Sequence, residues 1–314
     1  MKQSSFSSLA YSHKKKKTKR ELFLEEMDKA MPWSRLLKLI NPHYPKARYG
    51  RRPMPLDQML RIYFLQQWFN LSDPAMEDSL YDIESMRRFS GIDLGSDPVP
   101  DETTILKFRH LLERHDLMAK LFTETDKFLA EQGLVCRQGT IVDATIIHAP
   151  SSTKNKEHKR DPEMSSTKKG NQWFFGMKAH IGTCSKRGLV HSVVVTTASV
   201  HDSEVADDLL HGREREIYGD KAYVNEEKRR VFIGKGGRWR VQQKASRGKS
   251  LTEQEQKWNR SRSKVRSLVE HPFGVIKHLW GYRKVRYRGI HKNAAQVFTL
   301  MMLSNLYRVR AELC

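Results

Sequence analysis

The chain has 314 residues, of which 38% are hydrophobic, and its 57 Lys and Arg against 36 Asp and Glu give a formal net charge of +21. This length suffices for one large or two moderate cores, and cations spread over the whole sequence favour a polyanionic partner, with nucleic acid the first candidate. No stretch reaches the roughly 18 apolar residues of a spanning helix and no segment has a basic amphipathic pattern, so we expect no membrane partner.

The amino terminus carries a basic run, HKKKKTKR at residues 13–20, with no apolar stretch beside it. It is therefore not a secretory signal. We expect residues 1–20 to form a disordered basic arm. Two interpretations of the run stay open, a solvated tail and a specific DNA contact or address tag.

Residues 21–135 are predicted to form a helical domain, because apolar positions recur there every three or four residues. One such stripe runs from Leu56 to Trp68. Another helix is expected to begin after the cap residue Asp101, and a further one covers residues 117–132. These stripes are what a helical core needs, but a helix-turn-helix DNA reader has the same spacing, so both interpretations stay open.

From residue 140 the pattern changes to that of β-strands. Residues 140–147 are a run of β-branched and small residues interrupted only by Asp143, and a polar, Lys-rich loop is expected over 148–171. Alternation over 173–181 predicts a half-buried strand with Trp173 on its apolar face. The other expected elements are a strand over 189–197 that completes a hairpin, a helix over 201–210, a strand over 217–220, a helix over 225–233 and a strand over 238–244.

This order of elements is that of an RNase H-like fold, whose first and fourth strands are neighbours. The predicted fold class is therefore α/β, with an RNase H-like mixed-sheet catalytic domain over residues 136–314 preceded by the all-helical domain. Open sheets of this kind place their sites at strand ends where the strand order switches. Asp143 and Asp220, which belong to the first and fourth strands, are thus expected side by side.

Three carboxylates are candidates for chemistry. Asp143 lies in an apolar strand, where a carboxylate is costly unless it is paired or binds metal. Asp220 ends a short strand, and Glu270 is the only acid among ten Lys or Arg between residues 257 and 288. Taken singly, these acids have structural explanations: an ion pair or backbone hydrogen bond for Asp143, a turn cap for Asp220, and a counter-charge for Glu270.

As a set, the three acids fit metal-dependent phosphodiester transfer. Two divalent ions about 3.5–4 Å apart need about three carboxylates in a site of hard oxygen ligands. Mg2+ suits such ligands, and we expect Mn2+ to substitute for it. The surrounding cations are then available to bind DNA phosphates next to the scissile bond.

Basic residues near these acids are the candidate DNA contacts. Arg266, Glu270 and Lys277 are spaced four and seven residues apart, which brings them to one face of a continuous helix, although Pro272 predicts a kink. Lys178 shares the polar face of its strand with His180, where DNA contact and ordinary surface are both open interpretations.

Two further features keep two interpretations each. The loop over residues 154–169, with Lys168 and Lys169 at its end, is a mobile DNA clamp or a solvated loop. The pair His201-Asp202 is a metal pair or a helix cap supplied by Asp202.

Long blocks of the sequence carry a resemblance. They are GRRPMPLDQMLRIYFLQQWFNLSDPAMEDSLYDI, VDATIIHAPSSTKNKEHKRDPEMSSTKKGNQWFFGMKAHIG, GDKAY, and R-x3-E-x6-K at Arg266, Glu270 and Lys277. Over nearly its whole length the chain resembles bacterial insertion-sequence transposases of the IS-five type, which carry an Asp, Asp, Glu triad. The group's fuller signature has a Tyr three residues before the Arg, where this chain has Ser263.

The resemblance implies roles for these residues. Asp143, Asp220 and Glu270 would bind metal and catalyse, and Arg266 and Lys277 would contact DNA or the transition state. The expected function is metal-dependent cleavage at terminal inverted repeats and transfer of the freed 3'-hydroxyls into target DNA. The expected partners are double-stranded DNA and further copies of the chain in a homodimer or higher synaptic oligomer, because paired ends imply paired protomers.

Two alternatives remain for the function: an RNase H-like nuclease that cuts without joining, and a catalytically silent DNA-binding protein derived from a transposase. The chain's three cysteines show no paired spacing, which favours a reducing compartment. We expect the protein in the bacterial cytoplasm, associated with the nucleoid.

Overall fold

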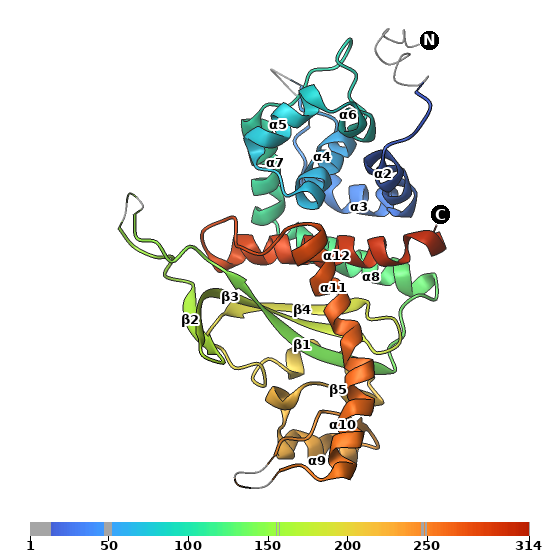
Figure 1. Ribbon diagram of the computed structural model, residues 1–314. Coiled ribbons are helices and arrows are strands. Elements are labelled where there is room, and N and C mark those ends of the chain that lie inside the picture. Colours follow the sequence, from blue (N-terminus) through green and yellow to red (C-terminus); the bar gives the residue numbers. More distant parts are fainter. Residues whose placement is uncertain are drawn as a thin grey trace. The chain divides into compact units, whose positions relative to one another are not determined.

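The computed structural model describes residues 14–46, 52–154, 156, 158–245, 248 and 250–313 (Figure 1). The chain divides into two compact units, one with residues up to 117 and from 306 onward, the other with residues 118–305. The division falls after the first residue of α8 (Leu117–Glu131), a helix that the sequence predicts as part of the helical domain. The reason is packing, since Phe122 of α8 contacts the ring of Phe298 at 5.8 Å in the second unit.

The first unit is helical throughout its described residues. Its elements are α2 (Lys19–Ala30), α3 (Trp33–Ile40), α4 (Leu56–Phe69), α5 (Asp73–Asp82), α6 (Glu84–Ser90) and α7 (Glu102–Arg114). The stripe predicted from Leu56 to Trp68 is confirmed as α4, which ends at Asn70 in the left-handed conformation. Asp101 caps α7 as predicted, since its side chain accepts a hydrogen bond from the N–H of Thr104.

The basic arm is shorter than predicted where the structure describes it. Residues 1–13 lie outside the described residues, and α2 already begins at Lys19. Thr18 and Glu21 form a reciprocal capping box at its first turn, which explains why the helix includes the end of the basic run.

The second unit is built on a six-stranded mixed sheet. Its strands are β1 (Gly139–His148), β2 (Ser165–Lys169), β3 (Gln172–Cys184), β4 (Val190–Thr197), β5 (Glu216–Tyr218) and β6 (Arg238–Trp239). The path runs β2-β3-β1-β5-β6, and β4 also pairs with β3. β1 pairs with β3 antiparallel and with β5 parallel, so the predicted adjacency of these two strands and the predicted β3–β4 hairpin are both confirmed.

The described residues of the second unit also form five α-helices. They are α8, α9 (Glu226–Gly234), α10 (Glu253–Arg266), α11 (Glu270–Gly274) and α12 (Ile290–Leu313), whose residues up to 305 belong here. Asn305 fastens α12 to β4, because its side-chain amide bonds both the N–H and the C=O of Val190 at 2.8 and 2.6 Å. A separate apolar cluster joins Val142 of β1 to Ile217 of β5, and Phe232 of α9 packs against it.

Three expectations about this unit are wrong, and a fourth, the strand over 238–244, is confirmed only for Arg238–Trp239. The loop over 148–171 contains β2, because Ser165–Lys169 pairs with the first residues of β3. The helix expected over 201–210 is reduced to a single 3-10 turn, Asp207–Leu209. Trp173 does not lie on a buried face: its side chain is 68% exposed, since it sits where β3 extends past the sheet centre into the β2–β3 hairpin.

Among the described residues, no helix combines the length and apolar character needed to cross a membrane.

Candidate active site

Asp143 lies within β1 and is largely buried, with a side chain 17% exposed. One carboxylate oxygen accepts a hydrogen bond from the N–H of Ala144, and the other accepts from Nη1 of Arg266 at 2.9 Å. Burial raises the pKa of Asp143 to about 6; the Arg266 guanidinium opposes this rise, and the charges of Asp220 and Asp202 add to it. A further cation beside Asp143 would therefore stabilise its ionised form.

Asp220 reaches the same region from β5. The last parallel pair of β1 and β5 is Ile141 with Tyr218, and Asp143 and Asp220 each follow it by two residues. The side chain of Asp220 caps the turn Lys221–Tyr223, accepting a hydrogen bond from the N–H of Ala222 at 2.8 Å. Asp220 therefore caps a turn, as its structural explanation predicted. It also lies close enough to Asp143 for its charge to raise the pKa of that residue.

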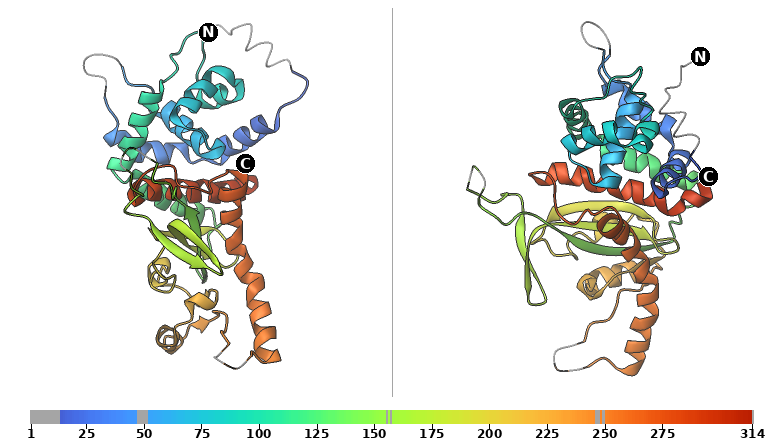
Figure 2. Two further views of the ribbon diagram at one scale, coloured as in Figure 1. Left: turned by 60° about the vertical axis from the view of Figure 1, so that its left-hand side comes forward. Right: turned by 45° about the horizontal axis from the view of Figure 1, so that its top comes forward.

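Glu270 lies on a broken helix. α10 ends at Arg266, a 3-10 turn covers Ser267–Val269, and α11 begins at Glu270 and passes into a π-helical turn, Val275–Leu279. The helix changes type where a kink was predicted, because Pro272 cannot donate a backbone hydrogen bond and its ring crowds the carbonyl four residues earlier, in the 3-10 turn. Figure 1 shows α10 as a long orange rod that leads to α11, and Figure 2 shows the same rod from two further sides.

Arg266 connects the helix to the strand. Its Nη1 donates to Asp143, and its Nη2 donates to Glu270 at 3.2 Å. The Glu270 side chain is 61% exposed, so this acid lies at the open side of the group. Asp143, Arg266 and Glu270 are therefore brought together as the sequence predicts, with the guanidinium between the two acids.

Hydrogen bonds to the segment after β6 hold α10 in place. The amide of Asn259, a buried residue, accepts from the N–H of Gln243 and donates to its C=O, at 2.9 and 3.1 Å. One turn later Ser263 accepts from the side chain of Gln242 at 2.6 Å. Ser263, the position at which the signature of the resembled group has a Tyr, therefore helps to place the turn that carries Arg266.

Lys277 faces the strand. Its Nζ donates to Oγ1 of Thr145 and to the C=O of Ile146, at 2.6 and 2.7 Å. Burial lowers the pKa of Lys277 to about 8, with further lowering by the charges of Lys169 and Arg283. In this structure Lys277 ties the π-helical turn to β1 just beyond Asp143.

Lys178 is engaged inside the protein. Its Nζ donates to Asp202 and to the C=O of Val200 at 2.9 and 2.7 Å, and the side chain is 13% exposed. His180, on the same face of β3, is completely buried and contacts Oγ1 of Thr196 at 2.8 Å. Burial, aided by the charge of Lys178, lowers the pKa of His180 to about 4 against the opposing effect of Asp202, so its ring is neutral at pH 7. DNA contact by Lys178 remains an untested prediction.

The two remaining basic candidates, Lys168 and Lys169, lie on β2, opposite Trp173 and Gln172 of β3, and both are exposed. Asp202, which the sequence offered as half of a metal pair or as a helix cap, instead pairs with Lys178, and its charge adds to the rise in the pKa of Asp143. Local spacing does not contain this tertiary contact. Sequence reasoning missed Tyr223 of the GDKAY block. The buried hydroxyl of this tyrosine has no hydrogen-bond partner among the described residues, and burial together with the charges of Asp202, Asp143 and Asp220 raises its pKa.

The chemistry of the donors fits a divalent ion that prefers oxygen ligands. Asp143 and Asp220 present carboxylates from adjacent strands, and their mutual repulsion is relieved by positive charge. Within the described part of the chain, no three His, Cys, Asp or Glu side chains form a ready metal cluster. The guanidinium of Arg266 supplies the positive charge next to Asp143 in this structure.

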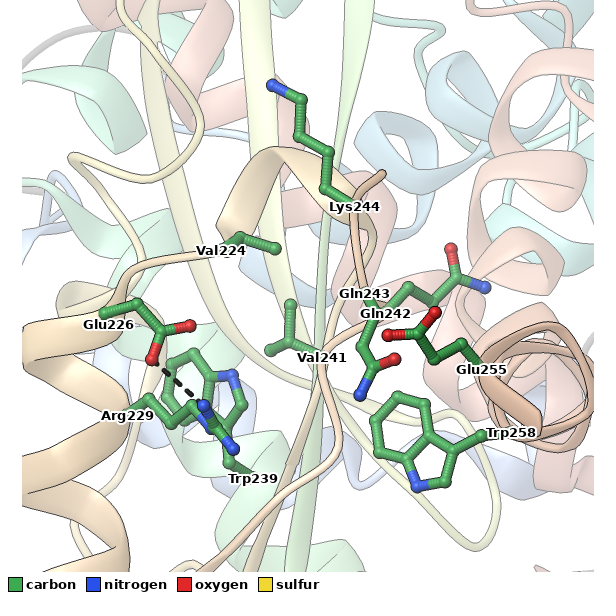
Figure 3. A pocket seen from close by; sticks show the side chains of 10 residues that line it. All are labelled: Val224, Glu226, Arg229, Trp239, Val241, Gln242, Gln243, Lys244, Glu255 and Trp258. Atoms are coloured by element: carbon green, nitrogen blue, oxygen red, sulfur yellow. Dashed lines mark hydrogen bonds and ion pairs between the residues drawn. The ribbon is translucent and has the colours of Figure 1, made fainter. Parts of the chain in front are cut away.

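A separate pocket of the same unit lies between α9, the segment after β6, and α10 (Figure 3). Trp239 and Trp258 line it from opposite sides of Val241, and the ion pair of Glu226 with Arg229 forms part of its wall. None of the predicted site residues lines this pocket.

The sheet and its acids together define an α/β protein with a carboxylate site just past the last paired residues of two neighbouring parallel strands, facing a basic helix. The chain belongs to the Transposase DDE domain family, whose model matches residues 135–306, more than half of the sequence. A second family model, Transposase domain (DUF772), matches residues 11–111. The protein is therefore a transposase, and the predicted assignment to DNA transposition is confirmed at this level.

Among solved structures, the chain is similar to the protein described as "piggyBac transposase synaptic complex with hairpin DNA". The two share 12% sequence identity with a TM-score of 0.45, and the match covers 94% of this chain and 74% of that chain.

Proposed function

We propose that this transposase cleaves DNA at the terminal inverted repeats of an insertion sequence and transfers the freed 3'-hydroxyls into target DNA. Asp143, Asp220 and Glu270 would hold Mg2+, with Mn2+ as a substitute. The bound ions would activate water or a 3'-hydroxyl as nucleophile and stabilise the leaving oxygen. The catalytic unit is proposed to have the RNase H-like fold, and the element to be a bacterial one of the IS-five type.

One observation carries the proposal, the parallel register of β1 and β5. It sets Asp143 and Asp220 at equivalent positions on neighbouring strands, each two residues past the last paired residues. Main-chain pairing fixes these positions before any ligand binds, as a site for in-line displacement requires. A chance pair of surface acids would lack such support.

The residues around the acids have separate roles in this proposal. Arg266 holds Asp143 and Glu270 together through its two terminal nitrogens, and in the presence of the ions it is available to a phosphate oxygen. Lys277 holds the π-helical turn on β1 and thereby places the segment that begins at Glu270. Lys168 and Lys169 would contact DNA phosphates from the exposed hairpin.

The helical unit is proposed to recognise the element's ends and to assemble the synaptic complex as a homodimer or higher oligomer. We propose that the protein works on double-stranded DNA in the bacterial cytoplasm, at the nucleoid. Footprinting that found residues 21–132 dispensable for end-specific binding would overturn the role of the helical unit.

The test is a reaction of the purified protein with three components: linear DNA carrying the element's ends, a supercoiled target plasmid, and Mg2+. The ends are found as short inverted repeats bounded by small direct duplications in the DNA that flanks the gene. We expect joined products. Cutting without joining would favour the nuclease alternative, and binding without cutting would favour the silent one.

Asp143→Asn is the control for this reaction, because it keeps the side-chain shape and removes the charge. We expect it to bind the end DNA and to form no joined product. Unchanged joining by this variant would contradict the assignment of the site.

A further inference from the structure

The β2–β3 hairpin carries an exposed tryptophan at its tip. A two-residue loop, Gly170 and Asn171, joins the strands, and Gly170 has a φ of +61°, a value that favours glycine and suits a tight hairpin turn. Trp173, one residue into the paired part of β3, is 68% exposed, more than any other large hydrophobic residue that the structure describes. Its indole makes no ring or cation-π contact with the described residues.

Strand alternation explains this exposure. Phe174 turns toward β1, where its ring meets that of His148 edge to face at 5.2 Å. Because neighbouring residues of a strand point to opposite faces, Trp173 and Phe175 lie on the other face of the hairpin. The indole therefore lies on a paired strand, not on a loop. The opposite face of this strand is held by the contact of Phe174 with His148.

Cations accompany the aromatic rings on this outer face. Lys168 is the direct cross-strand partner of Trp173, so their side chains lie on the same face. The guanidinium of Arg160 lies 5.4 Å from the centre of the Phe175 ring. Lys168 and Arg160 are both exposed, so two rings and two cations form one surface.

The hairpin adjoins the carboxylate site along β1. The register places Gly176 of β3 opposite both His148 of β1 and Ser165 of β2, so all three strands meet at that level. On the other face of β2, the charge of Lys169 acts on Lys277, which is bonded to Thr145, two residues past Asp143.

We infer that the outer face of this hairpin (Arg160, Lys168, Trp173 and Phe175, called here the hairpin face) binds an unpaired stretch of the DNA strand at the site, with Trp173 stacked on a nucleobase. The two cations contact the flanking phosphates. The inference rests on the proposed function, which identifies the substrate as DNA. It adds a protein–base contact that can form only where the two DNA strands have separated.

The chemistry of the hairpin face distinguishes single strands from a duplex. Lys and Arg bind phosphates of either form, whereas an indole can cover a base only when that base has left the stack. Every base has an aromatic face, so this contact needs no particular sequence. A surface that served the duplex backbone alone would gain nothing from an exposed indole beside Lys168.

The test measures dissociation constants of the full chain for a 20-nucleotide oligothymidylate and for a 20-base-pair duplex, without divalent metal. We expect Trp173→Ala to weaken binding of the single strand by about 5- to 150-fold and to leave the duplex near its wild-type value. Trp173→Phe keeps a stacking ring and should retain most of the affinity. Lys168→Ala should weaken both ligands and lower the salt dependence of each by about one ion.

Val231→Ala, which trims a 53% exposed apolar side chain on α9, is the matched control and should change neither constant. Thermal unfolding of Trp173→Ala should match the wild type, because the residue is exposed. Equal effects of Trp173→Ala on both ligands, no effect on either, or a change of oligomeric state in place of a binding defect would each overturn the inference. Metal is absent, so this binding result stands apart from the strand-transfer reaction that tests the proposed function.

Discussion

The strand half and the helix half of the carboxylate site are built differently. Asp143 and Asp220 follow paired positions of two adjacent strands, and the Asp143 side chain is mostly buried. Glu270 follows a break in a helix, is 61% exposed, and is connected to Asp143 through one arginine. The strand half is thus fixed by the backbone, whereas side-chain contacts fix the helix half, which should tolerate change better.

The largest expected effect separates the two halves directly. Asp143→Glu inserts a methylene where the chain is packed and should lower the strand-transfer rate by about a thousandfold or more, as loss of a principal stabilising group does. Glu270→Asp shortens an exposed side chain and should lower it by only about ten- to a hundredfold. The measurement is the single-turnover rate of joining, and equal losses would contradict the comparison.

The next effect concerns the residue that joins the halves. Arg266→Lys replaces a planar fork by a single ammonium that cannot bond Asp143 and Glu270 in the same way. We expect the rate of joining to fall by about ten- to a hundredfold. A rate within experimental error of the wild type would show that the bridge between the acids has no part in catalysis.

The sheet that carries Asp143 should make the folded protein less stable in acid. His191 of β4 contacts Thr140 of β1 at 3.2 Å, and burial, with the charges of His211 and Arg137, lowers the pKa of His191 to about 3. The unfolded chain binds a proton on this ring below about pH 6.5 while the folded chain does not, so stability falls as the pH drops from there toward 3. Between pH 7 and 5 the loss from this group should be about 2 kcal/mol.

Urea unfolding at several pH values measures this loss. His191→Gln has no titrating ring and should lack that part of the pH dependence, whereas the exposed His201→Gln should keep it. The same slope in all three proteins would contradict the assignment to His191.

The smallest effect tests how α10 is held. Asn259→Ala removes the two hydrogen bonds to the main chain of Gln243 and should lower the free energy of unfolding by about 1–2 kcal/mol. The exposed Gln254→Ala on the same helix is the control and should change it little. Because α10 ends at Arg266, joining by Asn259→Ala should also slow. A variant that is destabilised but joins DNA at the wild-type rate would show that these hydrogen bonds of α10 do not position the site.

The sequence predicts the strand half well, for a physical reason. A run of β-branched and small residues predicts β1, and the single acid within that run marks Asp143 as a candidate site residue. The order of elements predicts that β1 and β5 are neighbours. α4 and α7 are equally predictable, since an apolar stripe or a capping Asp101 marks them locally.

The remaining features depend on tertiary contacts that local patterns do not contain. Lys178 resembles a surface cation, yet Asp202 from a later loop pairs with it. Trp173 resembles a core residue, yet the hairpin carries it beyond the packed part of the sheet. The helix expected over 201–210 has suitable residues, but most of that segment takes other conformations.

The most direct test of the carboxylate site uses Fe2+ in place of Mg2+ with ascorbate and peroxide, so that radicals formed at the bound ion cut the nearby polypeptide. We predict cuts near residues 143, 220 and 270 that disappear with excess Mg2+ and in Asp143→Asn. Cuts elsewhere, or a pattern unchanged in that variant, would contradict the account.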